Sequence, residues 1–370
     1  MDRSIIRGAL TMGGTIIGAG VFAVPAAMRQ SGVLRATVAF WIVAFAILAV
    51  HLIYSEVVLR NKKLGRERFP GQVRALLGSG LAKVAFITYP GQILGACLAY
   101  VLLGGGFLSV LLNAFGVHLP DFGSNLLFWL GGAFTVLFGI AIVARVEVLM
   151  TLLLFFLLVV CSVLFLPLGA LSTWFLVGST SHLLAALGVF VFALFGMPVI
   201  PEIAVLCAQN RGRTQQAIII GSLGAAFLIW LFGAYAGAAL PAGALGHPQE
   251  IAGLLPPLYW WLVPAIGLLA VATSFITLTQ DLVTTLHVDA RCPPRLALFL
   301  ALIIPLFLAF FVRDVLPTVG LVGAIFGGMN GCLAALMGLE LPIARRSRPV
   351  AFVCVLTAAI FLLIVLSRII

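Results

Sequence analysis

Charged residues are scarce in this chain, and their scarcity excludes most classes of protein. Only 9% of the 370 residues are Asp, Glu, Lys or Arg, whereas 63% are hydrophobic. A water-soluble domain carries roughly 25% charged residues. The composition therefore predicts an all-α polytopic membrane protein whose surroundings are the lipid bilayer. The net charge of +10 does not indicate nucleic-acid binding, because the basic residues are not gathered into one patch.

Clusters of metal-binding or catalytic side chains are also missing. The six cysteines are scattered and lie mostly in apolar segments, where cysteine packs as a small hydrophobic residue. The five histidines show no metal-ligand spacing. No nucleophilic side chain is expected at the same membrane depth as a general base or a set of metal ligands. We therefore expect no enzyme, no bound cofactor other than a coupling ion, and no obligate protein partner.

Long apolar runs make up most of the chain. About 20 apolar residues cross the hydrocarbon core of a membrane, and eleven segments reach roughly that length. We expect these spans at 5–30, 34–59, 82–113, 125–143, 147–170, 182–206, 216–240, 258–286, 295–312, 315–339 and 350–368. The polar stretch 60–81 predicts a short amphipathic cytoplasmic element between the second and third spans.

The basic residues predict the orientation. With the N-terminus inside, seventeen of the 21 Lys and Arg residues fall in cytoplasmic segments, and only Arg29, Arg35, Arg313 and Arg368 fall outside. The positive-inside rule then places the N-terminus in the cytoplasm and the C-terminus, after eleven spans, outside. We expect a multi-pass protein of the cytoplasmic (inner) membrane.

Four glycines interrupt the first span, in the sequence Gly13-Gly14-Thr15-Ile16-Ile17-Gly18-Ala19-Gly20. Each weakens a helix by roughly 1 kcal/mol relative to alanine. Freed backbone at that depth is tolerated only where it is buried in protein or lines a polar cavity. The pattern indicates a helix broken at a solute site. The alternative is a seam of small residues that packs helices closely.

A second interruption lies in the sixth span, at Phe192-Ala193-Leu194-Phe195-Gly196-Met197-Pro198-Val199-Ile200-Pro201-Glu202. Each proline removes an amide donor and disfavours helix before it. A proline kink without function is the alternative, but paired interruptions in two halves of a chain point to a binding site.

Five spans separate the two interruptions, so the two broken helices cross the membrane in opposite directions. This topology predicts a five-plus-five inverted repeat with one added helix. We expect the first repeat at 1–170, the second at 182–339 and helix 11 at 350–370. No convincing residue identity relates the two halves.

The two interruptions also resemble a known superfamily. Gly14-Thr15-Ile16-Ile17-Gly18-Ala19-Gly20-Val21-Phe22 resembles the first-helix signature of the amino acid–polyamine–organocation superfamily, and Phe192 to Gly196 followed by Pro201-Glu202-Ile203 resembles helix 6 of its permeases. Ala99-Tyr100 and Ser274-Phe275 are similar to the aromatic and hydroxy amino acid permeases, which include the tryptophan/tyrosine permeases. The chain resembles the amino acid/auxin permeases almost as well. The resemblance implies the fold of the bacterial leucine transporter.

A zwitterionic amino acid needs donors for its carboxylate and acceptors for its ammonium group. The amides of Gly18, Ala19 and Gly20 stand at the positive end of a half-helix and suit the carboxylate. Carbonyls freed near Phe192 suit the ammonium group. No charged side chain lies in either break, which favours a neutral substrate, aromatic or otherwise hydrophobic or hydroxylated. Gln92 is either a pocket residue or a polar tie between helices. The predicted substrate-binding residues are Thr15, Gly18, Ala19, Gly20, Tyr100, Phe192, Ala193, Phe195 and Gly196.

Two sites are candidates for binding the ion that drives transport. Ala270-Val271-Ala272-Thr273-Ser274 has the Ala-x-x-Thr-Ser pattern of the second sodium site in sodium-coupled relatives. With freed carbonyls it would form an all-oxygen Na⁺ site from Gly14, Ile17, Ala270, Thr273 and Ser274. The alternative is that the two hydroxyls bond to their own helix. Glu202 is the candidate for gating or for H⁺ coupling, because a carboxylate within a membrane is a functional hypothesis by default.

The leading hypothesis is a secondary active transporter that carries a neutral amino acid by cation-coupled alternating access, as a symporter. The alternative is a permease-fold amino acid sensor, such as a germinant-receptor-like subunit, which binds the amino acid without turnover.

Overall fold

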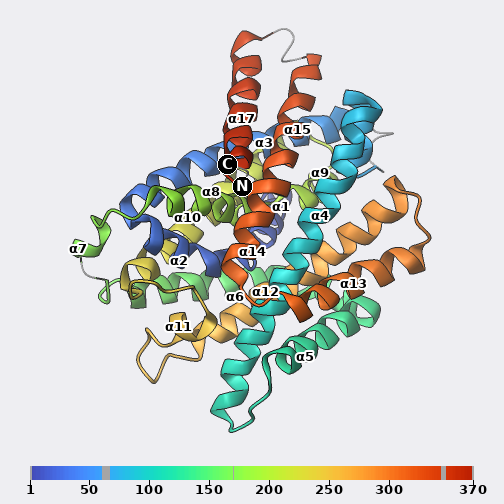
Figure 1. Cartoon of the computed structure of the whole chain (residues 1–370). Coiled ribbons are helices and arrows are strands. Elements are labelled where there is room, and N and C mark those ends of the chain that lie inside the picture. The colour runs from blue at the N-terminus through green and yellow to red at the C-terminus, as the bar shows by residue number, and fades with distance from the viewer. Residues whose placement is uncertain (1, 61–66, 170, 343–346, 369–370) are drawn as a thin grey trace.

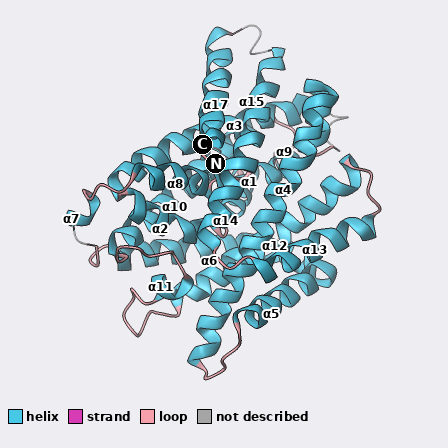
Figure 2. Cartoon of the chain, viewed as in Figure 1, coloured by secondary structure: helices cyan, strands magenta, loops and turns pink. Residues whose placement is uncertain are grey.

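The structure is a computed structural model of the chain, and it describes residues 2–60, 67–169, 171–342 and 347–368, with side chains outside 138–148 and 171. Helices joined by loops make up this part of the chain, and it contains no strand (Figures 1 and 2). The elements are α1 (Arg3–Ile16), α2 (Gly20–Ser31), α3 (Val33–Arg60), α4 (Phe69–Ala114), α5 (Asp121–Phe134), η2 (Thr135–Gly139), α6 (Ile140–Phe165), α7 (Leu171–Trp174), α8 (Thr180–Ala193), η3 (Met197–Val199), α9 (Ile200–Leu206), α10 (Arg211–Ala239), α11 (Pro248–Ala252), α12 (Leu262–Thr284), η4 (Thr285–Asp289), α13 (Pro294–Phe311), α14 (Val315–Leu321), η5 (Val322–Gly327), α15 (Gly328–Glu340) and α17 (Arg348–Leu366).

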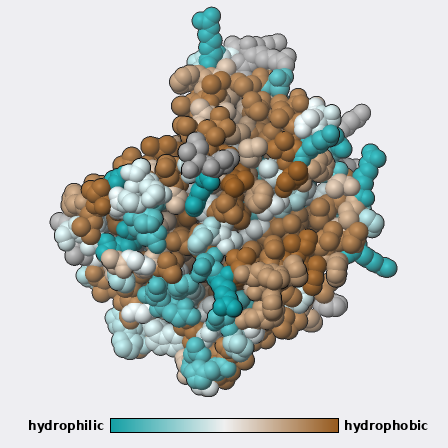
Figure 3. Space-filling view, in the orientation of Figure 1, coloured by the Kyte–Doolittle hydropathy of each residue, from teal (hydrophilic) through white to brown (hydrophobic). Residues whose placement is uncertain are grey.

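The protein is an integral multi-pass membrane protein. Eight helical stretches of the described chain are long and apolar enough to span a membrane, and the bent pair α1 and α2 makes a ninth. These nine coincide with nine of the eleven expected spans. The other two, 125–143 and 147–170, fall on α5, η2 and α6. The count of eleven and the inverted repeat therefore stay predictions. Hydrophobic residues cover most of the visible surface, as lipid contact requires (Figure 3).

The first span is broken where the glycines predict. α1 ends at Ile16, Ile17 has a non-helical backbone (φ −80°, ψ 84°), and α2 starts at Gly20 with a bend of 58° between the two. The amide of Gly18 turns back to the carbonyl of Ile16 at 3.0 Å instead of continuing the helical ladder. The tight turn therefore releases neighbouring backbone groups at mid-span.

The sixth span is broken before its prolines. α8 ends at Ala193, and Gly196 has a non-helical backbone (φ −133°, ψ 10°). Pro198 and Pro201 then occupy the first turns of η3 and α9, where a missing N–H costs no helical hydrogen bond. The two prolines thus start the new helical pieces, and the residues between Ala193 and Met197 form the break.

The two broken spans meet at the centre of the molecule. α2 packs against α8, and α1 packs against α10. At the contact, a side chain on Gly20 would collide with the backbone of Ala193. The absence of a Cβ at Gly20 therefore lets the two interruptions approach backbone to backbone.

The polar stretch before the third span is helical from Phe69 in its described part, and its amphipathic and cytoplasmic character stays a prediction. α4 begins at Phe69 and bends at Gly78, whose φ of 87° lies in the left-handed region. Asp289 caps the start of α4, because its carboxylate accepts from the amides of Arg68 (3.0 Å) and Gly71 (2.8 Å). This cap fixes Arg68 at the mouth of the cavity described below.

Candidate substrate-binding site

A small cavity lies where the two breaks face α4. Six of the nine predicted substrate residues line it: Thr15, Gly18, Gly20, Tyr100, Phe192 and Phe195. The other three, Ala19, Ala193 and Gly196, are buried in the breaks beside it. The cavity has a volume of about 10 Å³, which is close to the space of one water molecule. Among the residues that the structure describes, no Asp, Glu, Lys, Arg or His lines it.

Unpaired backbone groups surround this central cavity. Within the described chain, the amides of Ala19 and Gly20 donate no backbone hydrogen bond, and the carbonyls of Ala193 and Phe195 accept none. The amide of Gly18, which was expected to bind the carboxylate, is already bonded to Ile16. The break in the first span thus offers donors and the break in the sixth offers acceptors, which is the complement of a zwitterion.

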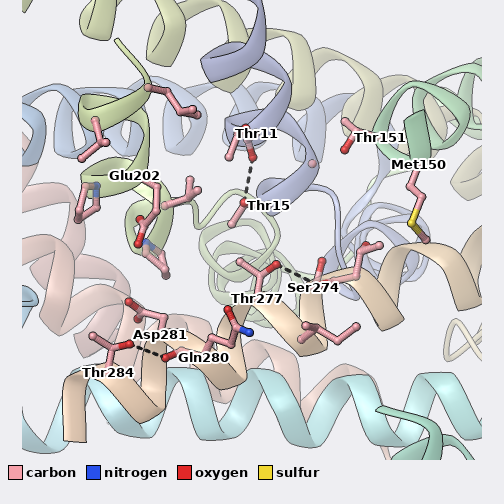
Figure 4. A pocket seen from close by; sticks show the side chains of 18 of the residues that line it. Thr11, Thr15, Met150, Thr151, Glu202, Ser274, Thr277, Gln280, Asp281 and Thr284 are labelled. Atoms are coloured by element: carbon pink, nitrogen blue, oxygen red, sulfur yellow. Dashed lines mark hydrogen bonds between the residues drawn. The ribbon is translucent and has the colours of Figure 1, made fainter. Parts of the chain in front are cut away.

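A larger cavity of about 570 Å³ leads away from the centre toward Arg68 and α9. We call this cavity the vestibule. Figure 4 shows Ser274, Thr277, Asp281 and Thr284 of α12 along its wall. Thr15 lines both cavities and marks their junction.

A buried cluster of aromatic side chains joins α2, α4 and α10. The ring of Phe22 on α2 lies edge-on to Phe107 of α4 at 4.6 Å and to Phe232 of α10 at 5.8 Å between centroids. All three are at most 1% exposed. These rings pack the three helices tightly together, and none of them lines the central cavity or the vestibule.

The charged groups of the vestibule form one connected cluster. Arg68 binds Glu202 of α9 at 2.7 Å and lies 3.5 Å from Asp281 of α12, whose other oxygen accepts from the hydroxyl of Tyr89 at 2.8 Å. Burial would lower the pKa of Arg68, but Asp281 and Glu202 together raise its pKa above the ordinary value. Arg68 thus stays charged and links the start of α4 to α9 and α12.

The sequence predicts a membrane-embedded carboxylate at Glu202, but the buried carboxylate is that of Asp281. The side chain of Glu202 is 46% exposed in the vestibule, whereas that of Asp281 is 5% exposed. Asp281 was not selected as a site residue. It lies seven residues after Ser274, two helical turns along the same face, and this spacing could have indicated it.

The predicted cation ligands are partly brought together. Gly14, Thr273 and Ser274 line the vestibule, whereas Ile17 and Ala270 are fully buried and do not. The hydroxyl of Thr273 donates to its own helix at Leu269 (2.9 Å) and Ala270 (3.1 Å). That of Ser274 is buried beside the hydroxyl of Tyr100, and among the described residues no backbone N–H reaches the carbonyls of Gly14 or Ile17. Freed carbonyls of this kind are the oxygen ligands that a hard monovalent cation takes, and a Na⁺ site here stays a prediction.

His51 is a further polar residue that the sequence did not single out. It is fully buried on α3, where its Nε2 accepts from the amide of Gly196 at 3.2 Å and its Nδ1 lies 3.1 Å from the hydroxyl of Ser222 on α10. Because Nε2 accepts a hydrogen bond from an amide, the neutral ring carries its proton on Nδ1, which donates to the hydroxyl of Ser222. His51 therefore fixes the break of the sixth span to two intact helices.

Replacing His51 with leucine is expected to destabilise the protein by about 2–5 kcal/mol, because the amide of Gly196 and the hydroxyl of Ser222 each lose their partner. Thermal unfolding of the purified protein measures the loss. His51→Gln, whose amide oxygen can accept from Gly196, should recover part of it. Equal stability of the leucine variant and the unchanged protein would contradict this assignment.

The comparisons with known proteins agree with this geometry. The family model described as the tryptophan/tyrosine permease family matches residues 1–245, about two thirds of the chain. The chain belongs to the tryptophan/tyrosine permease family. The resemblance seen in the two interrupted spans is thereby confirmed. No curated protein matches the sequence significantly.

Two solved transporters have a similar fold. One is MHP1, a nucleobase-cation-symport-1 family transporter in a closed conformation with bromovinylhydantoin bound, at 16% identity and a TM-score of 0.65 over 92% of this chain and 79% of that one. The other is a histidine-to-alanine mutant of the Eremococcus coleocola manganese transporter. It is 13% identical, with a TM-score of 0.64 over 97% of this chain and 84% of that one. This tryptophan/tyrosine permease family member is thus a membrane transporter built on the leucine-transporter-like fold.

Proposed function

We propose that this permease family member is a secondary active transporter for a neutral amino acid with an aromatic, hydrophobic or hydroxylated side chain. The observation that carries the proposal is the pair of breaks beside the central cavity, where the amides of Ala19 and Gly20 and the carbonyls of Ala193 and Phe195 have no backbone hydrogen-bond partner among the described residues. No ionised side chain of the described residues lines this cavity, so a substrate with a net charge would be left without a counter-charge. The two ends of a zwitterion would satisfy both sets of groups.

The transporter works by alternating access in this proposal. The packed rings of Phe22, Phe107 and Phe232 would close one path to the site, and the vestibule, which shares Thr15 with the central cavity, would be the other. With the N-terminus inside, as the charge distribution predicts, the vestibule would open to the cytoplasm and the C-terminus would lie outside. Closure of the vestibule by α1 and α9 would then accompany opening of the aromatic cluster.

Coupling to Na⁺ at Gly14, Ile17, Ala270, Thr273 and Ser274 completes the proposal. When bound, the ion would supply positive charge beside the break of the first span. The alternative coupling ion is H⁺, carried by Glu202, whose partner Arg68 joins α9 to α4 and α12.

Uptake of a panel of radiolabelled amino acids into proteoliposomes tests this function. We expect accumulation of at least one neutral amino acid against its gradient, driven by an imposed Na⁺ gradient at fixed pH. Preloading with the same unlabelled amino acid should also produce counterflow in the absence of an ion gradient. Binding of an amino acid without uptake or counterflow would contradict transport and indicate a sensor.

A further inference from the structure

A relay of three buried polar side chains ends at the central cavity. The hydroxyl of Thr88 on α4 donates to Oδ1 of Asn330 on α15 at 2.7 Å, and Nδ2 of Asn330 donates to Oε1 of Gln92 at 2.7 Å. Thr88, Asn330 and Gln92 are 6%, 0% and 1% exposed. Thr88 also lies 3.0 Å from the carbonyl of Val84, a longer contact. The relay therefore holds the amide of Gln92 with its oxygen turned toward α15.

The relay leaves one polar atom of Gln92 unused. Its Nε2 is buried and has no hydrogen-bond partner in the described part of the chain, and the residue lines the central cavity. Buried donors in native proteins are almost always paired, because an unpaired one loses its hydration without compensation. Gly327 also leaves room here, since a Cβ at that position would lie 3.0 Å from Nε2. The acceptor must then come from the cavity, either from a water molecule or from an atom of a bound substrate.

The position of Gln92 identifies the part of the ligand it meets. Gln92 lies two turns before Tyr100 on α4, with Ala96 between them, and all three line the central cavity. Tyr100 is beside Gly18, near the amides assigned to the carboxylate. The small side chain of Ala96 leaves space between these two ends. The backbone groups of the breaks therefore hold the amino and carboxyl groups, and Gln92 faces the substrate side chain.

We propose that Gln92 is a specificity-determining residue that donates a hydrogen bond to an acceptor oxygen on the substrate side chain. This inference rests on the proposed function, because the substrate is taken to be an amino acid. It restricts the class to side chains with a hydroxyl or carboxamide oxygen. An apolar side chain of the same shape leaves Nε2 unpaired and is rejected, as sites built for a polar group reject analogues that lack it.

Three nearly isosteric pairs of radiolabelled amino acids test the inference: threonine with valine, tyrosine with phenylalanine, and asparagine with leucine. Each is measured in proteoliposomes as the concentration that gives half-maximal uptake. In at least one pair we expect the oxygen-bearing member to be preferred by about 10- to 100-fold. In Gln92→Met, which keeps the length of the side chain, this preference should fall to about threefold or less.

A second variant separates specificity from folding. The double variant Gln92→Met with Asn330→Leu removes both side-chain amides, so neither amide remains buried without the other. This variant should show the same loss of preference. Thr279→Val is the matched control, because Thr279 is fully buried on α12 and lines neither cavity. A purely structural role of Gln92 would weaken both members of a pair equally and leave their ratio unchanged.

The outcomes distinguish this inference from the function on which it rests. Uptake of neutral amino acids without preference for the oxygen-bearing members, or with a preference that survives in both Gln92 variants, would overturn the inference and leave the proposed function standing. Absence of uptake and counterflow for every neutral amino acid would overturn the proposed function and the inference with it.

Discussion

Replacing Gly18 with leucine is expected to reduce substrate affinity by about 100-fold or more while leaving membrane insertion intact. A Cβ on Gly18 would lie 2.8 Å from the hydroxyl of Tyr100 and 2.9 Å from that of Ser274, closer than real Cβ contacts allow. Overpacking of this kind costs about 1–3 kcal/mol, and the rest of the leucine side chain would enter a cavity of about 10 Å³. Binding of the transported amino acid to the purified variant measures the effect.

Gly196→Leu should have a similar effect from the other broken span. Its Cβ would lie 2.8 Å from Ile16 and 2.8 Å from Met12, so the two breaks would be pushed apart. Gly224→Leu is the matched control, because a Cβ on that exposed glycine of α10 meets nothing within 4 Å. Near-normal affinity in both Gly18→Leu and Gly196→Leu would mean that these glycines only pack helices together.

The second large effect concerns coupling. Replacing Thr273 and Ser274 together with alanine is expected to weaken the Na⁺ dependence of uptake by about 100-fold or more. Two hydroxyl ligands would be lost, and hydrogen-bonded or ligating contacts to a charged group contribute about 1.5–3 kcal/mol each. Folding should survive, because alanine is well tolerated in helices. The measurement is initial uptake as a function of Na⁺ concentration at fixed pH.

Two variants make the coupling experiment decisive. Thr277→Ala removes a neighbouring vestibule hydroxyl that bonds to its own helix at Thr273 and is not a predicted ligand, so its Na⁺ dependence should be unchanged. Glu202→Gln should keep Na⁺-driven uptake. Uptake that ignores Na⁺, follows the pH gradient and is lost in Glu202→Gln would assign coupling to H⁺.

The sequence by itself determined the membrane class, nine of the described spans and the positions of both breaks. These features depend on local chemistry: apolar length fixes a span, and glycine or proline weakens the helix at a defined residue. For the same reason the sequence indicated six residues that line the central cavity, since they lie in or opposite the breaks. It could not decide which freed backbone groups remain without a hydrogen-bond partner. The amide of Gly18 donates to the carbonyl of Ile16, and this bond depends on the geometry of the turn.

Only the tertiary structure decided which distant side chains share a cavity. The cluster of Arg68, Asp281 and Glu202 joins three helices, and the relay from Thr88 through Asn330 to Gln92 joins residues more than 200 positions apart. In an apolar chain, the sequence around a lone polar residue says little about its partner. Burial and hydrogen bonding are properties of the packed helices, so Asp281, His51 and Gln92 acquire distinct roles only once α3, α4, α12 and α15 are placed together.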